Sequence, residues 1–190
     1  MPKREIRHRM LELRRQLSSG SGWSSGIAAQ ELFLSLDEFA AARSVALYSP
    51  IRNEVDTALI SAASMEAGKT VCYPAVVGET LEFRRLTDPL DLVCGRYGIC
   101  EPPADSEIWP PETIDLFLVP GVAFALGGER IGYGKGYYDK ALHKLEGKGR
   151  LIGFCYDFQL VEAIAGAAHD VLMDAVVTDR RVLRPRGYFI

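Results

Sequence analysis

The sequence predicts an α/β fold in which helices cover both faces of a mostly parallel sheet. Two observations support this prediction. Short β-type runs alternate with helical stretches along most of the chain, which is typical of such folds. The chain has 190 residues, of which 48% are hydrophobic and 25% charged, and this suffices for a core without disulfides or metals. We therefore expect a single domain over residues 1–190.

Residues 2–17 are predicted to form an amphipathic helix. Its apolar positions fall on one stripe at helical spacing: Ile6, Met10, Leu13 and Leu17. A second, basic stripe borders the apolar one and consists of Lys3, Arg7 and Arg14. Such a stripe is either a solvated face of the helix or a row of cations above a cleft, and the spacing leaves both open.

The first half of the chain continues with a Ser/Gly-rich segment, Ser18 to Gly26, predicted to be a linker, and a helical stretch from Trp23 to Ala42. The next elements are expected in this order: a strand at 44–49 that ends at Pro50, a helix at 55–67 capped by Gly68, a strand at 70–73 that ends at Pro74, and an antiparallel strand at 80–86. Residues 87–113 hold five of the ten prolines and are predicted to form a long loop.

The second half begins with a buried strand at 115–119 that Pro120 stops, followed by a glycine-rich turn. A helix is expected from Lys135 to about Leu145, then strands at 150–156 and 175–178 with a helix between them. Ligands of such sheets bind outside the carboxyl ends of the strands. The glycine-rich turn leaves one of these ends, so it is the expected position of a site.

Charge and cysteine content narrow the classes of function. The net charge is −3, which argues against a dedicated nucleic-acid binder, so an anionic ligand needs a local basic cluster. The four cysteines (Cys72, Cys94, Cys100 and Cys155) form no CxxC pair and are expected to be buried free thiols. The sequence shows no apolar stretch typical of a signal peptide or a membrane span. We expect a soluble, cytoplasmic protein without membrane or nucleic-acid partners.

The segment Gly121–Gly136 holds six of the 18 glycines and is the strongest candidate for a binding site. Gly132, Gly134 and Gly136 leave backbone N–H groups open to an anion at the start of a helix. The segment around them also carries polar groups suited to phosphate, metal or a ring: Arg130, Lys135, Tyr137, Tyr138 and Asp139. It matches neither the Walker A pattern nor GxGxxG, so it is not a generic nucleotide motif.

Three other carboxylates and the histidines are further candidates for a functional role. Glu54 could accept hydrogen bonds from the amino and ring N–H groups of a heterocycle, or could serve the helix dipole, and both remain open. Asp170 and Asp174 precede the last strand and could reach the same sheet edge as metal ligands, or could be solvated. The three histidines show no ligand spacing, and no Ser-His-Asp or Cys-His set stands out.

Four segments resemble one known family over nearly the whole chain: KREIR, NEVDT, YGICEPP and VPGVAFALGGERIGYGKGYYDKAL. The chain resembles the 5-formyltetrahydrofolate cyclo-ligases, also called 5,10-methenyltetrahydrofolate synthetases. The resemblance implies a three-layer α/β/α fold with a mostly parallel, Rossmann-like sheet. It implies an ATP- and magnesium-dependent conversion of 5-formyltetrahydrofolate to the 5,10-methenyl form, with release of ADP and phosphate. A phosphorylated iminium is the expected intermediate, and no protein nucleophile is needed.

The resemblance also implies roles for individual residues. The expected ATP contacts are Lys3, Arg4, Arg7, Arg130, Gly132, Gly134, Lys135, Gly136, Tyr137 and Tyr138. The expected folate contacts are Ser49, Glu54, Tyr133, Gly134, Lys135, Gly136 and Tyr137. The expected magnesium ligands are Asp139 and Asp170, with Asp174 as the alternative to Asp170. Arg130, Lys135 and Tyr138 are expected to act at the reacting phosphate. Because Tyr133 is not basic as in some members, the phosphate-side charge would rest on Arg130 and Lys135.

Two alternative functions remain open at this point. The chain could bind nucleotide or folate without turnover, or could act as an ATP-dependent ligase on another N-formyl substrate. The joint presence of Lys3, Arg7, Arg130, Lys135 and Asp139 favours the cyclo-ligase, since a folate binder needs no phosphate and metal side. We expect a monomer or weak dimer.

Overall fold

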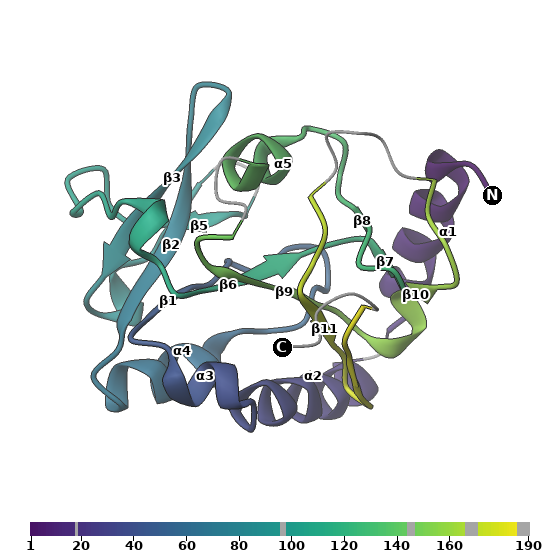
Figure 1. Cartoon of the computed structure of the whole chain (residues 1–190), viewed down its shortest axis with the longest axis horizontal. Coiled ribbons are helices and arrows are strands. Elements are labelled where there is room, and N and C mark those ends of the chain that lie inside the picture. Colours follow the sequence, from purple (N-terminus) through teal and green to yellow (C-terminus); the bar gives the residue numbers. More distant parts are fainter. Residues whose placement is uncertain (18, 96–97, 144–146, 166–170, 186–190) are drawn as a thin grey trace.

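The computed structural model describes residues 1–17, 19–95, 98–143, 147–165 and 171–185. In this part of the chain, seven strands form one central sheet with helices on both faces (Figure 1). Their order across the sheet is β12 (Val182–Leu183), β11 (Ala175–Val177), β9 (Arg150–Phe154), β6 (Leu116–Pro120), β1 (Ser44–Ala46), β2 (Thr70–Val77) and β3 (Thr80–Leu86). The five inner strands run parallel and the two edge strands antiparallel, which confirms the predicted fold class.

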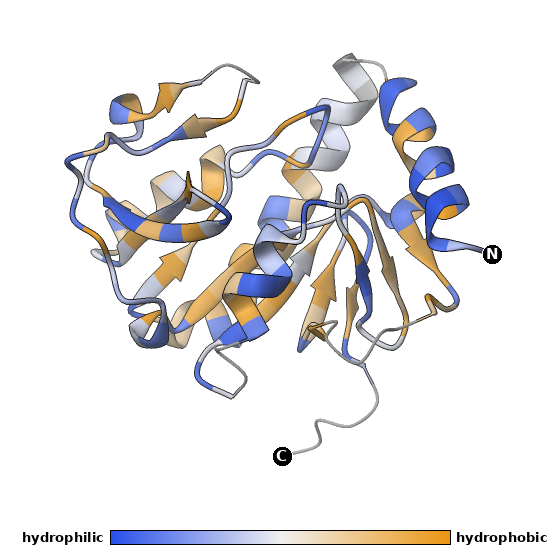
Figure 2. Cartoon of the chain, turned by 90° about the horizontal axis from the view of Figure 1, so that it is seen from above, coloured by the Kyte–Doolittle hydropathy of each residue, from blue (hydrophilic) through white to orange (hydrophobic). Residues whose placement is uncertain are grey.

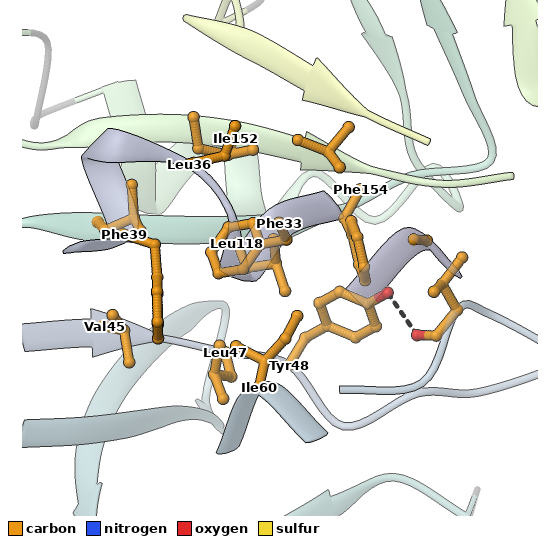
Figure 3. Close-up of a cluster of buried hydrophobic side chains, with 14 of the residues drawn as sticks. Phe33, Leu36, Phe39, Val45, Leu47, Tyr48, Ile60, Leu118, Ile152 and Phe154 are labelled. Atoms are coloured by element: carbon orange, nitrogen blue, oxygen red, sulfur yellow. Dashed lines mark hydrogen bonds between the residues drawn. The ribbon is translucent and has the colours of Figure 1, made fainter. Parts of the chain in front are cut away.

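Three helices cover one face of the sheet, seen below it in Figure 1: α2 (Ser19–Leu34), α3 (Asp37–Ala41) and α4 (Ala58–Glu66). Phe33 of α2 is fully buried and lies edge-on to Phe154 of β9, with 6.0 Å between the ring centroids. Leu47, Leu118 and Ile152 pack in the same cluster (Figure 3). This face holds the largest of the hydrophobic clusters among the described residues.

The opposite face is covered by α5 (Tyr137–Leu142) and by α1 (Lys3–Arg15) with a small sheet. The hydrophobic cluster between α5 and the sheet includes Phe83, Phe117 and Leu142. Ile6 and Met10 of α1 pack against the small sheet, which was not predicted and consists of β10 (Leu160–Val161), β7 (Ala123–Ala125) and β8 (Arg130–Ile131). Seen from above, hydrophobic residues follow the central strands while α1, beside the N label, is largely hydrophilic (Figure 2). The predicted N-terminal helix is confirmed, and its apolar stripe is buried at these two residues, whereas Leu13 of the same stripe is exposed.

Several element boundaries in the first half of the chain were predicted wrongly. The strand predicted at 44–49 ends at Ala46, and the helix predicted at 55–67 spans Ala58–Glu66. The Ser/Gly-rich segment is not a linker, because α2 begins at Ser19. Two of its three glycines have neighbours close by, since a Cβ at Gly22 would lie 3.7 Å from Leu17 Cβ and one at Gly26 would lie 3.9 Å from the Tyr156 hydroxyl. This packing offsets the low helix propensity of the segment. The predicted helix up to Ala42 is divided at Leu36, whose backbone is extended and whose side chain is buried.

The strand predicted to stop at Pro74 continues to Val77. Pro74 pairs with Phe83, whose carbonyl accepts from Trp109 N at 2.8 Å rather than from β2. The pair is therefore not hydrogen-bonded within the ladder, and the N–H that proline lacks is not needed there. In the predicted long loop, Cys94 and Cys100 form a disulfide between β4 (Val93–Cys94) and β5 (Cys100–Glu101). The expectation of free thiols is wrong for this pair and confirmed for the buried Cys72 and Cys155.

Two predicted helices of the second half also differ. Helix α5 begins at Tyr137 rather than Lys135, because Gly136 has a left-handed backbone that the helix cannot include. Between β9 and β11 the described residues form a 3-10 turn, Asp157–Gln159, and β10 in place of the expected helix, and residues 166–170 lie outside the description. Further 3-10 turns occur at Pro89–Asp91 and Pro111–Thr113. None of the described helices is long and apolar enough to cross a bilayer.

Candidate functional site

The candidate site lies at the topological switch point of the central sheet, between β1 and β6. From β1 the chain adds β2 on one side, and later adds β6, β9 and β11 on the other. The carboxyl ends of β1 and β6 are therefore adjacent, and their following loops diverge, which is the usual place for ligands in such sheets. The loop after β1 contains Ser49 and Glu54, and the segment after β6 leads to the glycine-rich turn.

Glu54 is turned inward by a tight loop. Arg52 and Asn53 both have left-handed backbones, with φ values of 49° and 58°. This reversal brings the Glu54 carboxylate below the surface, where Oε2 accepts from Ile51 N at 3.0 Å and Oε1 accepts from the Tyr133 hydroxyl at 3.0 Å. Glu54 and Tyr133, which come from different loops and were both predicted to contact the folate, are thus in direct contact.

Arg14 completes this buried cluster from α1. Its side chain is only 1% exposed, and Nη1 lies 3.7 Å from Glu54 Oε1. Nη2 donates to the Tyr133 hydroxyl, and Nε donates to the Arg52 carbonyl at 3.0 Å. The sequence placed Arg14 on the basic stripe of α1 but gave no sign that it is buried against Glu54.

Burial dominates the electrostatics of this cluster. Removal from water raises the pKa of the Glu54 carboxyl above its ordinary value, and the Arg14 guanidinium opposes that rise. Burial, together with the Glu54 charge, raises the pKa of Tyr133 to about 12. Tyr133 therefore remains protonated near neutral pH and can donate its hydroxyl proton to Glu54.

The glycine-rich turn is in contact with α1 through Arg7. Arg7 Nε donates to the Gly132 carbonyl at 2.9 Å. A Cβ at Gly132 would lie 2.8 Å from Arg130 Nη1, so this position has no room for a side chain beside the guanidinium. Gly134 and Gly136 have φ values of +98° and +70°, which other residues adopt at a cost. The turn therefore brings two arginines from different elements to its backbone.

Arg130 and Asp139 form a second polar pair at the other side of the turn. Arg130 Nη2 lies 2.7 Å from Asp139 Oδ1, and Nη1 donates to the Pro120 carbonyl at 3.3 Å. The guanidinium carbon is 5.7 Å from the centroid of the Tyr138 ring. Burial strongly raises the pKa of Tyr138 above its ordinary value. Arg130 Nε is buried without a hydrogen-bond partner among the described residues, so it is a donor available for a ligand.

The remaining predicted residues are spread around this centre. Lys135 and Arg4 are exposed, whereas Lys3 and Tyr137 are partly buried. Ser49 Oγ accepts from Cys100 N at 3.2 Å, which ties it to β5, and no hydrogen bond in the described part of the chain joins it to Glu54. The structure therefore brings Glu54 into contact with Tyr133 of the glycine turn. Ser49 is bonded to β5 instead.

Magnesium is the cofactor that the sequence resemblance implies. Asp170 lies outside the described residues, and its alternative, Asp174, already accepts from Leu151 N at 2.7 Å. Within the described residues no three His, Cys, Asp or Glu side chains gather as metal ligands. Magnesium nevertheless often uses one or two carboxylates together with substrate phosphates. Asp139, partly exposed beside the glycine turn, fits such a role if Arg130 turns toward phosphate.

A pocket of about 300 Å³ opens beside Glu54 on the α2 side. Its walls come from segments far apart in the sequence: Leu17, Trp23, Ile27, Leu59 and Tyr156, with Asn53 and Asp56 next to Glu54. Sequence reasoning did not find Trp23 or Tyr156 as lining residues, because no local spacing connects them.

The fold and the site define a three-layer α/β protein in which a cluster of Glu54, Arg14 and Tyr133 lies beside a basic glycine turn at the carboxyl ends of the strands. The model of the 5-formyltetrahydrofolate cyclo-ligase family matches residues 1–179, and the chain belongs to that family. It is 30% identical to the 5-formyltetrahydrofolate cyclo-ligase of Escherichia coli K12 over 174 residues, covering 89% of this chain and 96% of that protein.

Solved structures agree with this assignment. The NMR structure of Aquifex aeolicus 5,10-methenyltetrahydrofolate synthetase superposes with a TM-score of 0.87 at 36% identity, over 100% of this chain and 96% of the other. The Mycoplasma pneumoniae 5,10-methenyltetrahydrofolate synthetase has a TM-score of 0.77 at 26% identity, over 95% and 100% of the two chains.

Proposed function

We propose that this chain converts 5-formyltetrahydrofolate to 5,10-methenyltetrahydrofolate and uses ATP and magnesium to do so. The observation that carries the proposal is the contact between Glu54 and Tyr133, which joins a buried acceptor to the glycine turn within 3.0 Å. A heterocycle held at Glu54 would lie next to phosphates held at the turn. Membership in the cyclo-ligase family supports the folate substrate.

The folate would be held at Glu54. Its carboxylate has lone pairs left after accepting from Ile51 N and Tyr133, and these suit the amino and ring N–H groups of a pterin. Charge-assisted hydrogen bonds of this kind are stronger than neutral ones and favour one orientation. Ser49 and the backbone of the turn at Gly134 to Tyr137 would contact the folate from the sides.

ATP would occupy the glycine turn and the basic residues around it. The backbone N–H groups of the turn suit phosphate oxygens, as does Arg130 Nε, which has no hydrogen-bond partner among the described residues. Lys135 adds an exposed cation. Lys3, Arg4 and Arg7 of α1 would contact the phosphates from the opposite side. Tyr137 and Tyr138 would flank the nucleotide at the start of α5.

In the proposed reaction the formyl oxygen attacks the γ-phosphorus of ATP, and the bond from phosphorus to ADP breaks. This produces a phosphorylated iminium at N5. The nitrogen N10 then attacks the carbon atom of this iminium. The N10 proton leaves, the carbon–oxygen bond to phosphate breaks, and the methenyl ring remains. Arg130 and Lys135 would neutralise charge on the transferring group, which supplies most of the catalysis in phosphoryl transfer. Magnesium, held by Asp139 and with Asp170 as the second proposed ligand, would supply further charge neutralisation.

A spectrophotometric assay tests this function. Purified protein is mixed with 5-formyltetrahydrofolate, ATP and magnesium, and the near-ultraviolet band of the methenyl product is followed together with ADP. A rise that requires ATP and matches the ADP released is the expected result. A flat trace with folded protein that still binds folate would instead indicate a non-catalytic binder, and one that turns over another N-formyl compound would indicate a different substrate.

The single domain, the monomer or weak dimer and the cytoplasmic location also remain proposals for this chain. Sedimentation of the purified protein measures the assembly, and a single unfolding transition is expected for one domain.

A further inference from the structure

Arg14 is the most deeply buried charged side chain among the described residues, and the proposed reaction gives it no direct role. Its three guanidinium nitrogens all have partners: Nε donates to the Arg52 carbonyl, Nη1 reaches the Gly121 carbonyl at 3.4 Å, and Nη2 donates to Tyr133. Its own carbonyl accepts from Asn53 Nδ2 at 3.0 Å. One residue of α1 thus touches both loops that form the site.

These contacts hold the two loops on either side of the Glu54 carboxylate. The Arg52 carbonyl belongs to the reversal that turns Glu54 inward, and the Gly121 carbonyl begins the segment that leads to the glycine turn. A guanidinium can bridge such acceptors because its donors form a rigid planar fork. A purely structural role would require no approach to the Glu54 carboxylate, yet Nη1 lies 3.7 Å from Oε1.

We propose that Arg14 is a positioning residue that keeps Glu54 ionised and aimed at the folate, with Tyr133 fixed as the second donor. The proposal rests on the folate role given to Glu54 above. Arg14 does not touch the reacting atoms. Without it, the carboxylate would be buried beside neutral groups and would bind a proton more readily.

The other groups that face Glu54 do not replace this charge. Arg52, on the same loop, is exposed, and its guanidinium lies over the Tyr133 ring at 5.4 Å from the centroid. Tyr133 from the glycine turn, Tyr48 after β1 and Tyr138 of α5 remain neutral, because burial raises the pKa of each. Arg14 is therefore the nearby buried cation on which the Glu54 charge depends.

The test compares Arg14→Gln with Arg15→Gln, a neighbouring arginine that is exposed and pairs with Glu12 in the same helix. The ¹³C signal of the Glu54 carboxyl, identified by its loss in Glu54→Gln, is titrated in each full-length protein without ligand. We expect Arg14→Gln to move the Glu54 titration upward by about one pH unit or more. The KM for 5-formyltetrahydrofolate should rise about tenfold or more, while the KM for ATP stays within about twofold.

The acid limb of the pH profile of kcat/KM for folate should also move to higher pH in Arg14→Gln, because Glu54 then stays protonated up to a higher pH. Arg14→Lys provides the second variant, and it decides the question if Arg14→Gln does not fold. Lysine keeps the charge but not the fork, so we expect a folate KM between those of the wild type and Arg14→Gln.

A folded Arg14→Gln protein with wild-type Glu54 titration and folate KM would overturn the proposal. An Arg14→Lys protein with a wild-type folate KM would overturn it as well, because lysine keeps the charge but not the fork. Equal effects of Arg14→Gln and Arg15→Gln would overturn it too. If the wild-type protein forms no methenyl product, the proposed function fails separately. The ligand-free titration of Glu54 then still supports or overturns the positioning role.

Discussion

At the scale of single residues, burial separates the two halves of the site. Glu54 is buried and Tyr133 partly buried, and the two depend on each other for charge state and hydrogen bonding. Lys135, in contrast, is exposed at the glycine turn and is free to follow a phosphate as it moves. A fixed recognition group for the heterocycle and a mobile cation for the transferring group suit the two proposed substrates.

Replacement of Glu54 should affect folate binding selectively. Glu54→Gln preserves the size of the side chain but removes the charge, so the KM for 5-formyltetrahydrofolate should rise about tenfold or more. The KM for ATP should change little, because the proposed phosphate contacts lie on the glycine turn. Steady-state kinetics with each substrate varied in turn measure both values, and Glu12→Gln on the exposed face of α1 is the control. An unchanged folate KM would remove Glu54 from the pterin site.

Replacement of Lys135 should affect the rate without affecting the fold. Lys135→Ala removes an exposed cation, so the midpoint of thermal unfolding should stay within about 2 °C. The value of kcat should fall about 100-fold or more, as it does when one group that stabilises transition-state charge is lost. Lys140→Ala, an exposed lysine of α5 that pairs with Glu79, is the matched control. Wild-type kcat in Lys135→Ala would contradict the assignment.

At the scale of elements, the glycine turn combines backbone geometry with position. Gly136 has a left-handed backbone immediately before α5, and open space surrounds the place where a Cβ would be. The cost of a side chain there is therefore conformational and not steric. Because the same turn is proposed to present N–H groups to phosphate, a change in its backbone should affect activity more than stability.

Gly136→Ala and Gly68→Ala form a matched pair. Gly68 ends α4 with a φ of +71°, close to the +70° of Gly136, and also has open space around it. Each alanine should lower the free energy of unfolding by about 1–2 kcal/mol, measured by urea denaturation. Only Gly136→Ala should also raise the KM for ATP or lower kcat. Equal activities of the two variants would show that the geometry of the turn is not required for function.

At the scale of the whole molecule, the site depends on contacts between distant parts of the chain. Arg14 reaches Gly121, 107 positions away, and Glu54 reaches Tyr133, 79 positions away. The sheet and the layers on its two faces hold these segments in place. The cluster on the α2 face supplies much of this rigidity, and Figure 3 shows Phe33 and Phe154 within it.

A core substitution on that face should lower stability strongly. Phe33 is fully buried and packs against Phe39 and Phe154, so Phe33→Ala should lower the free energy of unfolding by about 3–5 kcal/mol. Leu90→Ala, at a position that is 90% exposed, should change it by less than about 0.5 kcal/mol. Urea denaturation measures both. A loss below about 1 kcal/mol in Phe33→Ala would show that this cluster does not hold the sheet and helices together.

Local patterns predicted the parts of the protein that local chemistry determines. The stripe of Ile6 and Met10, the alternation of strands and helices and the glycine turn are all readable in short windows of sequence. The helix that begins at Ser19, the disulfide between Cys94 and Cys100 and the burial of Arg14 are not, because each depends on distant neighbours. Glu54 could be named as a candidate, but its contact with Tyr133 required the fold.

The most direct test follows the oxygen atom of the formyl group. The central claim is that folate and ATP meet at one site and that the formyl oxygen attacks phosphorus. When 5-formyltetrahydrofolate carrying ¹⁸O in the formyl group is converted with ATP and magnesium, the released phosphate should contain one ¹⁸O atom per methenyl product. Mass spectrometry measures this label. Methenyl product formed with unlabelled phosphate, or with no phosphate released, would contradict the account.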